Sequence, residues 1–274
     1  DGKYSAEYML PDCFGFPADL PTILAHSGVK GFSTQKLTWG SSAPGGGPES
    51  LEKTPEGTPF NVGVWTGPDG ESVLAALNPG SYSGGIDTDL SQPLPPLPPS
   101  AALQKAEQQM KDLRSRLEEA DDAGQLTEDD VQQFMTLRNE IEGLRKVRDD
   151  QELERFQGDW AARVQNNGKV TGIFTDYHYF GTGDIGGAPD EDSVRRLEAT
   201  VTKAQTSIPP AGYISFRGMK HPEWAPTQVG EGPVHVVSAT ADQMFRDLTA
   251  ADASSLPHYT GEMELTNHSA GSLT

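Results

Sequence analysis

Apolar residues in this chain of 274 residues occur in short runs separated by glycine, proline and polar turns. A first apolar run ends at Pro11, and residues 20–26 then carry apolar side chains at helical spacing with Pro21 in the first turn. Gly28 follows as a helix stop, and residues 29–37 read as a buried strand. The order strand, loop, helix, strand predicts an α/β fold with a parallel sheet.

The next apolar runs have the spacing of a β-hairpin. Residues 60–65 and 72–77 are strand-like and flank Gly67-Pro68-Asp69-Gly70, which has turn chemistry. Residues 92–99 alternate leucine with proline pairs, so this stretch can only be an extended polyproline spacer.

From Ala101 the composition changes to Gln, Glu, Lys, Arg and Leu, with apolar residues at helical spacing. Residues 121–126 form a loop, and Thr127 is a good cap for a second helix that continues to Val164. The two helices predict an antiparallel hairpin inserted at residues 100–166, with its apolar stripe packed between them.

After the hairpin, residues 169–179 form a β-rich run that predicts a strand. We expect helices at 189–205 and 239–248, with a strand between them at 213–216. The predicted organisation is one α/β domain interrupted by the helical hairpin. Its parts are 1–99, 100–166, 167–256 and 257–274, the last being the start of a following region.

The net charge of the chain excludes some classes of binding partner. The net charge of −19 and the pI near 4.6 disfavour nucleic acid and anionic membrane surfaces, because phosphates would be repelled. Much of the acidic excess lies in residues 107–154, as a solvated helical face. No apolar run is long enough for a membrane span, and Cys13 is the single cysteine, so no internal disulfide is expected. Homo-oligomer formation and compartment stay open.

A glycine-rich loop at residues 181–186 matches G-x-G-x-x-G after a predicted strand. A nucleotide site is disfavoured, because a pyrophosphate would meet Asp184 and the acids that open the next helix. A carboxylate beside His178 and Tyr179 suits sugar chemistry instead, since sugars stack on rings and glycosidic hydrolysis needs carboxylates. The alternative that Asp184 only caps a turn stays open.

The histidines by themselves do not predict a metal site, because no pair shows the i, i+4 spacing of a metal-binding helix. His268 lies in a polar run and, by itself, reads as a surface or structural residue.

Three motifs in order carry a family resemblance. The first is Pro11-Asp12-Cys13-Phe14-Gly15 with Leu20-Pro21, Ile23-Leu24 and Thr34-Gln35-Lys36-Leu37-Thr38-Trp39; the others span 180–189 and 264–274. Together they resemble the glycoside hydrolase family 38 α-mannosidases.

That resemblance implies an irregular seven-stranded α/β barrel, here incomplete, that hydrolyses α-mannosides in oligosaccharides with retention at Zn²⁺ or another divalent metal. Asp12 would be both nucleophile and metal ligand, His268 a second ligand, and Asp184 the acid/base. Phe14, His178 and Tyr179 would contact the sugar.

The family's remaining ligands, a histidine and an aspartate in an H-x-D motif, have no counterpart before Asp12. We therefore expect a fragment that binds metal poorly and is inactive alone. The competing expectation is a catalytically silent carbohydrate-binding or scaffold protein of the same fold.

Overall fold

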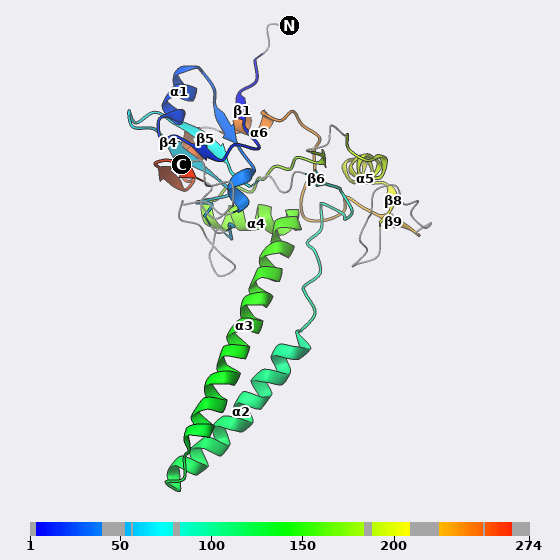
Figure 1. Cartoon of the computed structure of the whole chain (residues 1–274). Coiled ribbons are helices and arrows are strands. Elements are labelled where there is room, and N and C mark those ends of the chain that lie inside the picture. The colour runs from blue at the N-terminus through cyan, green and yellow to red at the C-terminus, as the bar shows by residue number, and fades with distance from the viewer. Residues whose placement is uncertain are drawn as a thin grey trace. The chain divides into compact units, whose positions relative to one another are not determined.

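A computed structural model describes residues 4–39, 53–55, 57–78, 83–183, 188–208, 225–248 and 250–264. The chain forms two compact units. The first comprises residues 1–94 and 156–274, and the second is Pro95–Arg155. Figure 1 shows the elements of both units.

A mixed sheet is the centre of the first unit. In the described residues it has five strands in the order β1 (Glu7–Met9), β3 (Gly31–Ser33), β5 (Ser72–Ala76), β4 (Val62–Thr66) and β10 (His258–Thr260). β1, β3 and β5 are mutually parallel, β4 is antiparallel to β5, and β10 is parallel to β4. The predicted α/β class with parallel strands is confirmed. The seven strands and the barrel stay predictions.

The expected strand–helix–strand order is present at the start of the chain. α1 (Leu20–His26) has the predicted bounds and connects β1 to its parallel neighbour β3. Gly28 follows with φ +78°, a left-handed conformation that glycine adopts without strain.

The strand predicted at 29–37 is too long. β3 ends at Ser33, and a 3₁₀ turn, η1 (Lys36–Trp39), follows. The polar side chains of this stretch bond backbone locally: the Thr38 hydroxyl donates to the Gln35 carbonyl at 2.8 Å. Such bonds compete with a continued strand.

The predicted hairpin is confirmed as β4 and β5. Its turn closes with Gly67 N donating to Glu71 O at 2.8 Å and Gly70 N donating to Gly67 O at 3.1 Å. The hairpin reverses the chain, which is why β4 and β10 run against the other three strands.

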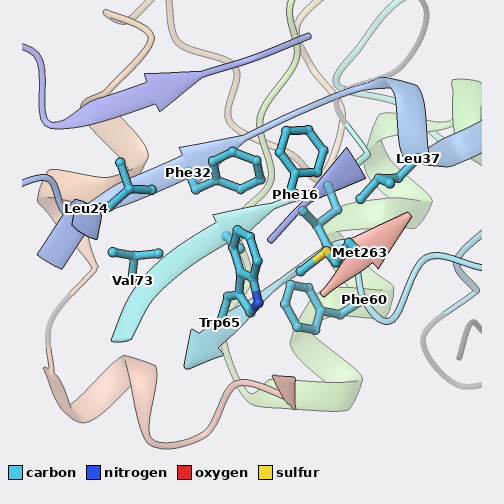
Figure 2. Close-up of a cluster of buried hydrophobic side chains, with 10 residues drawn as sticks. Phe16, Leu24, Phe32, Leu37, Phe60, Trp65, Val73 and Met263 are labelled. Carbon is cyan, nitrogen blue, oxygen red and sulfur yellow. The ribbon is translucent and has the colours of Figure 1, made fainter. Parts of the chain in front are cut away.

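Aromatic side chains fill the core on the face covered by α1 (Figure 2). Phe32 lies 4.9 Å from Phe16 and 5.2 Å from Trp65 between ring centroids. Trp65 is fully buried, and its indole Nε1 donates to the Gly261 carbonyl at 2.9 Å. The labelled members of this core are Phe16, Leu24, Phe32, Leu37, Phe60, Trp65, Val73 and Met263.

The opposite face packs against the C-terminal helices α6 (Gln243–Asp247) and α7 (Ala250–Ala253). Phe245 is its central ring, 1% exposed. The helix predicted at 239–248 is shorter than expected. Asp242, which precedes α6, accepts from Ala6 N at 2.8 Å rather than capping the helix.

The region after the helical hairpin differs most from expectation. The predicted second helix is interrupted at Asp159, whose Oδ1 accepts from Ala162 N at 2.9 Å and caps α4 (Trp160–Thr171). The strand predicted at 169–179 is wrong. Its first residues complete α4, Gly172 ends that helix with φ +80°, and residues 173–180 have no regular structure.

Short elements complete the first unit. β6 (Ser83–Gly84) pairs antiparallel with β7 (Gly181–Thr182), and β8 (Gln205–Ser207) pairs antiparallel with β9 (Pro226–Gln228). α5 (Glu191–Thr202) is shorter than the predicted 189–205. Its bounds are set by the Asp190 cap on Ser193 N, 2.8 Å, and by Lys203 in a left-handed conformation. The strand predicted at 213–216 lies outside the described residues.

The second unit contains α2 (Ala101–Asp122) and most of α3 (Glu128–Gly158), two helices that lie side by side in Figure 1. Its apolar stripe packs between the helices through Ala106, Met110, Ile141, Leu103, Phe134, Leu137 and Leu144. Arg145 bonds Glu107 across the pair at 2.7 Å. No helix in the described part of the chain is long and apolar enough to cross a membrane.

Candidate active site

The carboxyl ends of three parallel strands bring polar side chains to one edge of the sheet. Asp12 follows β1, Lys36 follows β3 and Asn78 follows β5. Ligands bind at this edge in α/β sheets, because the strand ends and their loops leave a crevice there. This edge is therefore the candidate active site.

Asp12 and Lys36 form an ion pair at this edge. The Lys36 ammonium lies 2.6 Å from Asp12 Oδ1, and the same ammonium sits 4.9 Å from the centroid of the Phe14 ring. The Lys36 side chain is 8% exposed and that of Asp12 is 57% exposed. The buried ammonium of Lys36 thus contacts both the accessible carboxylate of Asp12 and the ring of Phe14.

Backbone contacts fix the loop that carries Asp12. Leu10 N donates to Ser33 O at 3.0 Å, and the Thr34 hydroxyl donates to Leu10 O at 2.8 Å. These bonds tie the end of β1 to the end of β3. The residues that follow the two strands, Asp12 and Lys36, are consequently held next to each other.

A second pairing brings the C-terminal part of the chain to the same loop. β2 (Gly15–Phe16) pairs antiparallel with β11 (Met263–Glu264), with Glu264 opposite Gly15. Gly15 is three residues after Asp12 in the sequence, and Glu264 is four residues before His268. The C-terminal motif is therefore joined to the Asp12 loop by backbone hydrogen bonds at its first residue.

A buried polar network lies behind the edge. Asn78 donates to Asn61 Oδ1 at 2.8 Å, and Asn78 O accepts from Arg163 at 2.6 Å. Arg163 Nε pairs with Asp176 Oδ2 at 2.7 Å, with both side chains 1% exposed or less. The pair anchors the segment at 173–180 to α4.

Two predicted sugar contacts lie on this segment. The His178 ring packs on Trp160 at 3.7 Å between centroids. The Tyr179 hydroxyl donates to the Glu7 carboxylate of β1, and burial, together with that hydrogen bond, raises the pKa of Tyr179. Their role as sugar contacts stays a prediction.

The predicted residues are thus brought together only in part. Asp12 and Phe14 share one loop, while His178 and Tyr179 lie on another segment. Asp184 and His268 lie outside the described residues. Across the described ranges, no three histidine, cysteine or acidic side chains are grouped so as to hold a metal ion.

Sequence reasoning missed Lys36 and the Arg163–Asp176 pair as parts of this region. Lys36 stands within the motif at 34–39, so the motif itself was a signal for it. The pairing of Arg163 with Asp176 has no comparable signal, because it depends on α4 ending at Thr171 and the chain turning back.

Comparison with known proteins identifies the class. Residues 2–213 match the glycosyl hydrolases family 38 N-terminal domain. An α/β domain with a carboxylate at the carboxyl edge of its parallel strands, together with this match, defines a glycoside hydrolase domain. The chain belongs to glycoside hydrolase family 38, which confirms the resemblance found in its motifs.

Curated relatives align over a shorter stretch. Alpha-mannosidase G of Dictyostelium discoideum is 41% identical over 78 residues, 28% of this chain and 6% of that protein. Alpha-mannosidase 2C1 of Mus musculus is 39% identical over 83 residues, 30% of this chain and 7% of that protein. The alpha-mannosidase of Saccharomyces cerevisiae is 34% identical over 80 residues, 29% of this chain and 6% of that protein. The stretches of this chain that align thus cover 6 to 7% of the length of these relatives.

Proposed function

We propose that the protein containing this chain is a retaining, zinc-dependent α-mannosidase that hydrolyses α-mannosidic bonds in mannose-containing oligosaccharides. The family and the names of the curated relatives support the substrate class. Asp12 is the proposed nucleophile, and Asp184 is the proposed acid/base.

The pairing of β2 with β11 is the observation that carries the proposal. It joins the loop of Asp12 to the segment that leads to His268, through the register of Glu264 opposite Gly15. The two motifs are about 250 residues apart in sequence, yet the fold uses backbone hydrogen bonds to hold them together. A site built from both motifs requires such a connection.

The contacts of Asp12 suit a nucleophile. Its carboxylate is accessible, and the Lys36 ammonium at Oδ1 restricts its orientation for attack on the anomeric carbon. Phe14, packed against Lys36, offers its ring to an apolar face of the sugar. In a retaining reaction the resulting glycosyl ester is then hydrolysed by water, activated by the second carboxyl group.

Asp12 and His268 are the proposed zinc ligands of this chain. Bound zinc would act as a Lewis acid and orient sugar hydroxyls. Of these two, only Asp12 lies in the described residues, its Oδ1 faces an ammonium, and one donor does not make a zinc site.

The direct test is release of 4-nitrophenol from its α-mannoside by the full-length protein loaded with zinc. We expect turnover by the wild type, loss of at least about a thousandfold in Asp12→Ala, and inhibition by a chelator. Proton NMR of the first-formed sugar should show the α-anomer. Unchanged turnover in Asp12→Ala, or a β-anomer product, contradicts the mechanism.

A catalytically silent carbohydrate-binding protein is the second candidate. The ammonium of Lys36 that orients Asp12 also lowers the nucleophilicity of its carboxylate, and this second effect favours the silent protein. Calorimetric binding of a mannose oligosaccharide without its cleavage would support this function and exclude the enzyme.

A further inference from the structure

We propose that Tyr179 is a positioning residue, whose hydrogen bond to Glu7 holds the segment before the glycine-rich loop against β1, the strand that leads to Asp12. Its effect on catalysis rests on the proposed mannosidase function. The physical anchor itself does not.

Glu7 is the acceptor for two elements. Its Oε1 accepts from the Tyr179 hydroxyl and from the Ser33 hydroxyl of β3. Ser33 is fully buried, and Glu7 lies opposite Gly31 in the pairing of β1 with β3. One carboxylate therefore joins two adjacent strands of the sheet to the segment at 173–180.

The hydrogen bond between Tyr179 and Glu7 is strong because a neutral phenol donates to a carboxylate. Burial and the neighbouring carboxylate both raise the pKa of Tyr179, so its phenol keeps its proton and donates at neutral pH. A phenol that donates to a carboxylate makes a charge-assisted bond, about twice as strong as a neutral one.

Tyr179 lies between two other fixed points of the segment. Asp176, three residues earlier, is fixed by the buried Arg163. β7 begins two residues later and pairs with β6. Between these two, the Tyr179 hydroxyl bonds the segment to β1, the strand that leads to Asp12. Loss of this hydrogen bond should make the residues that precede the glycine-rich loop more mobile.

A neighbouring tyrosine provides a matched control. Tyr177 packs its ring 5.4 Å from that of Tyr179, and its buried hydroxyl has no hydrogen-bond partner among the residues described. Tyr177→Phe and Tyr179→Phe delete the same atom from adjoining rings. Only the second removes a hydrogen bond.

Hydrogen exchange measured by mass spectrometry on the full-length protein tests the anchor without substrate. In Tyr179→Phe we expect peptides covering 178–183 to exchange about tenfold faster than in the wild type, because a charge-assisted bond is lost. Tyr177→Phe should exchange like the wild type. Equal exchange in the two variants would overturn the proposal.

Steady-state kinetics then separates positioning from sugar contact. Tyr179→Phe should lower kcat about tenfold with KM within about twofold. Glu7→Gln, which keeps an acceptor, should retain more activity than Glu7→Ala. A raised KM at unchanged kcat would instead make Tyr179 a substrate contact, and an unchanged kcat per folded molecule would make the bond purely structural. Either result overturns the positioning role.

The two hypotheses fail differently. A wild type that cleaves no mannoside contradicts the proposed function, and the exchange experiment alone then decides the anchor. A wild type that is active, with identical exchange and kcat in both tyrosine variants, contradicts the anchor and leaves the proposed function intact.

Discussion

The ammonium of Lys36 lies 2.6 Å from the carboxylate of Asp12, and the two side chains differ sharply in burial, at 8% and 57% exposed. This asymmetry means that the two partners do not depend on each other equally. Water can solvate Asp12 if Lys36 is removed, whereas the Lys36 ammonium loses an important counterion if Asp12 is neutralised.

We therefore predict different stabilities for the two single variants. Lys36→Met should change the free energy of unfolding by no more than about 1 kcal/mol, because exposed carboxylates gain little from one ion pair and methionine suits a buried site. Asp12→Asn should cost about 1–3 kcal/mol, because a buried charge is left less well compensated. Urea unfolding measures both. A larger loss in Lys36→Met than in Asp12→Asn would contradict this reasoning.

The buried pair of Arg163 with Asp176 should be far more sensitive. Removing one partner leaves a charge inside the protein, so we predict that Asp176→Asn costs about 3–5 kcal/mol. Arg195→Ala is the matched control, because its pair with Glu191 on α5 has side chains 69% and 76% exposed. That variant should stay within about 0.5 kcal/mol of the wild type. Comparable losses in the two variants would show that the buried pair is solvated.

The hydrogen bonds of Asp242, which join Ala6 to α6, should contribute less to the stability of the fold in acid. The carboxylate of Asp242 accepts hydrogen bonds from Ala6 N, Arg246 and Thr240, which hold its pKa well below the usual range. A lowered pKa in the folded state contributes stability above the unfolded pKa of about 3.9, and this stability is lost as the pH falls toward the folded value.

The free energy of unfolding, measured from pH 6 to pH 2, should therefore decline less steeply below about pH 4 in Asp242→Asn than in the wild type. The variant should be less stable than the wild type at neutral pH. Parallel pH profiles of the two proteins would contradict the prediction.

Two glycines should respond in opposite directions to alanine. A Cβ at Gly31 would lie 2.1 Å from Cγ of the buried Phe245, so Gly31→Ala should cost about 1–3 kcal/mol through overpacking. A Cβ at Gly143 in α3 meets no described atom within 4 Å, and alanine there should stabilise the helix by about 0.5–1 kcal/mol. Circular dichroism melts of both variants provide the measurement. A stabilised Gly31→Ala would mean that the Phe245 ring moves aside at little cost.

Elements with strong local signals could be predicted from the sequence. The bounds of α1 are predictable because Pro21 and Gly28 mark its two ends. The β4–β5 hairpin is predictable because the residues between its strands, Gly67-Pro68-Asp69-Gly70, are typical of a turn. These signals act within a few residues and need no tertiary context.

The region at 159–180 could not be predicted in the same way. Its β-branched residues suggested a strand, but the Asp159 cap and the burial of Arg163 favour a helix to Thr171. Weak propensities give way to such tertiary contacts. The three-residue strand β10 was missed because it forms only where β4 offers it an edge.

The candidate site was predictable only as far as its motifs. Asp12 and Phe14 stood out in one pattern, and the structure adds that Lys36 supports both. The link from Tyr179 to Glu7 joins residues 172 positions apart, and nothing in either local sequence announces it.

The order of strands in the sheet also has a consequence for folding during synthesis. Four adjacent strands, β1, β3, β5 and β4, come from residues 7–76, so most of the sheet can assemble once these residues have left the ribosome. β10, from residues 258–260, pairs with the remaining edge of β4 and can do so only about 180 residues later in synthesis. Until then the edge of β4 is exposed, and a nascent chain is most vulnerable to aggregation there.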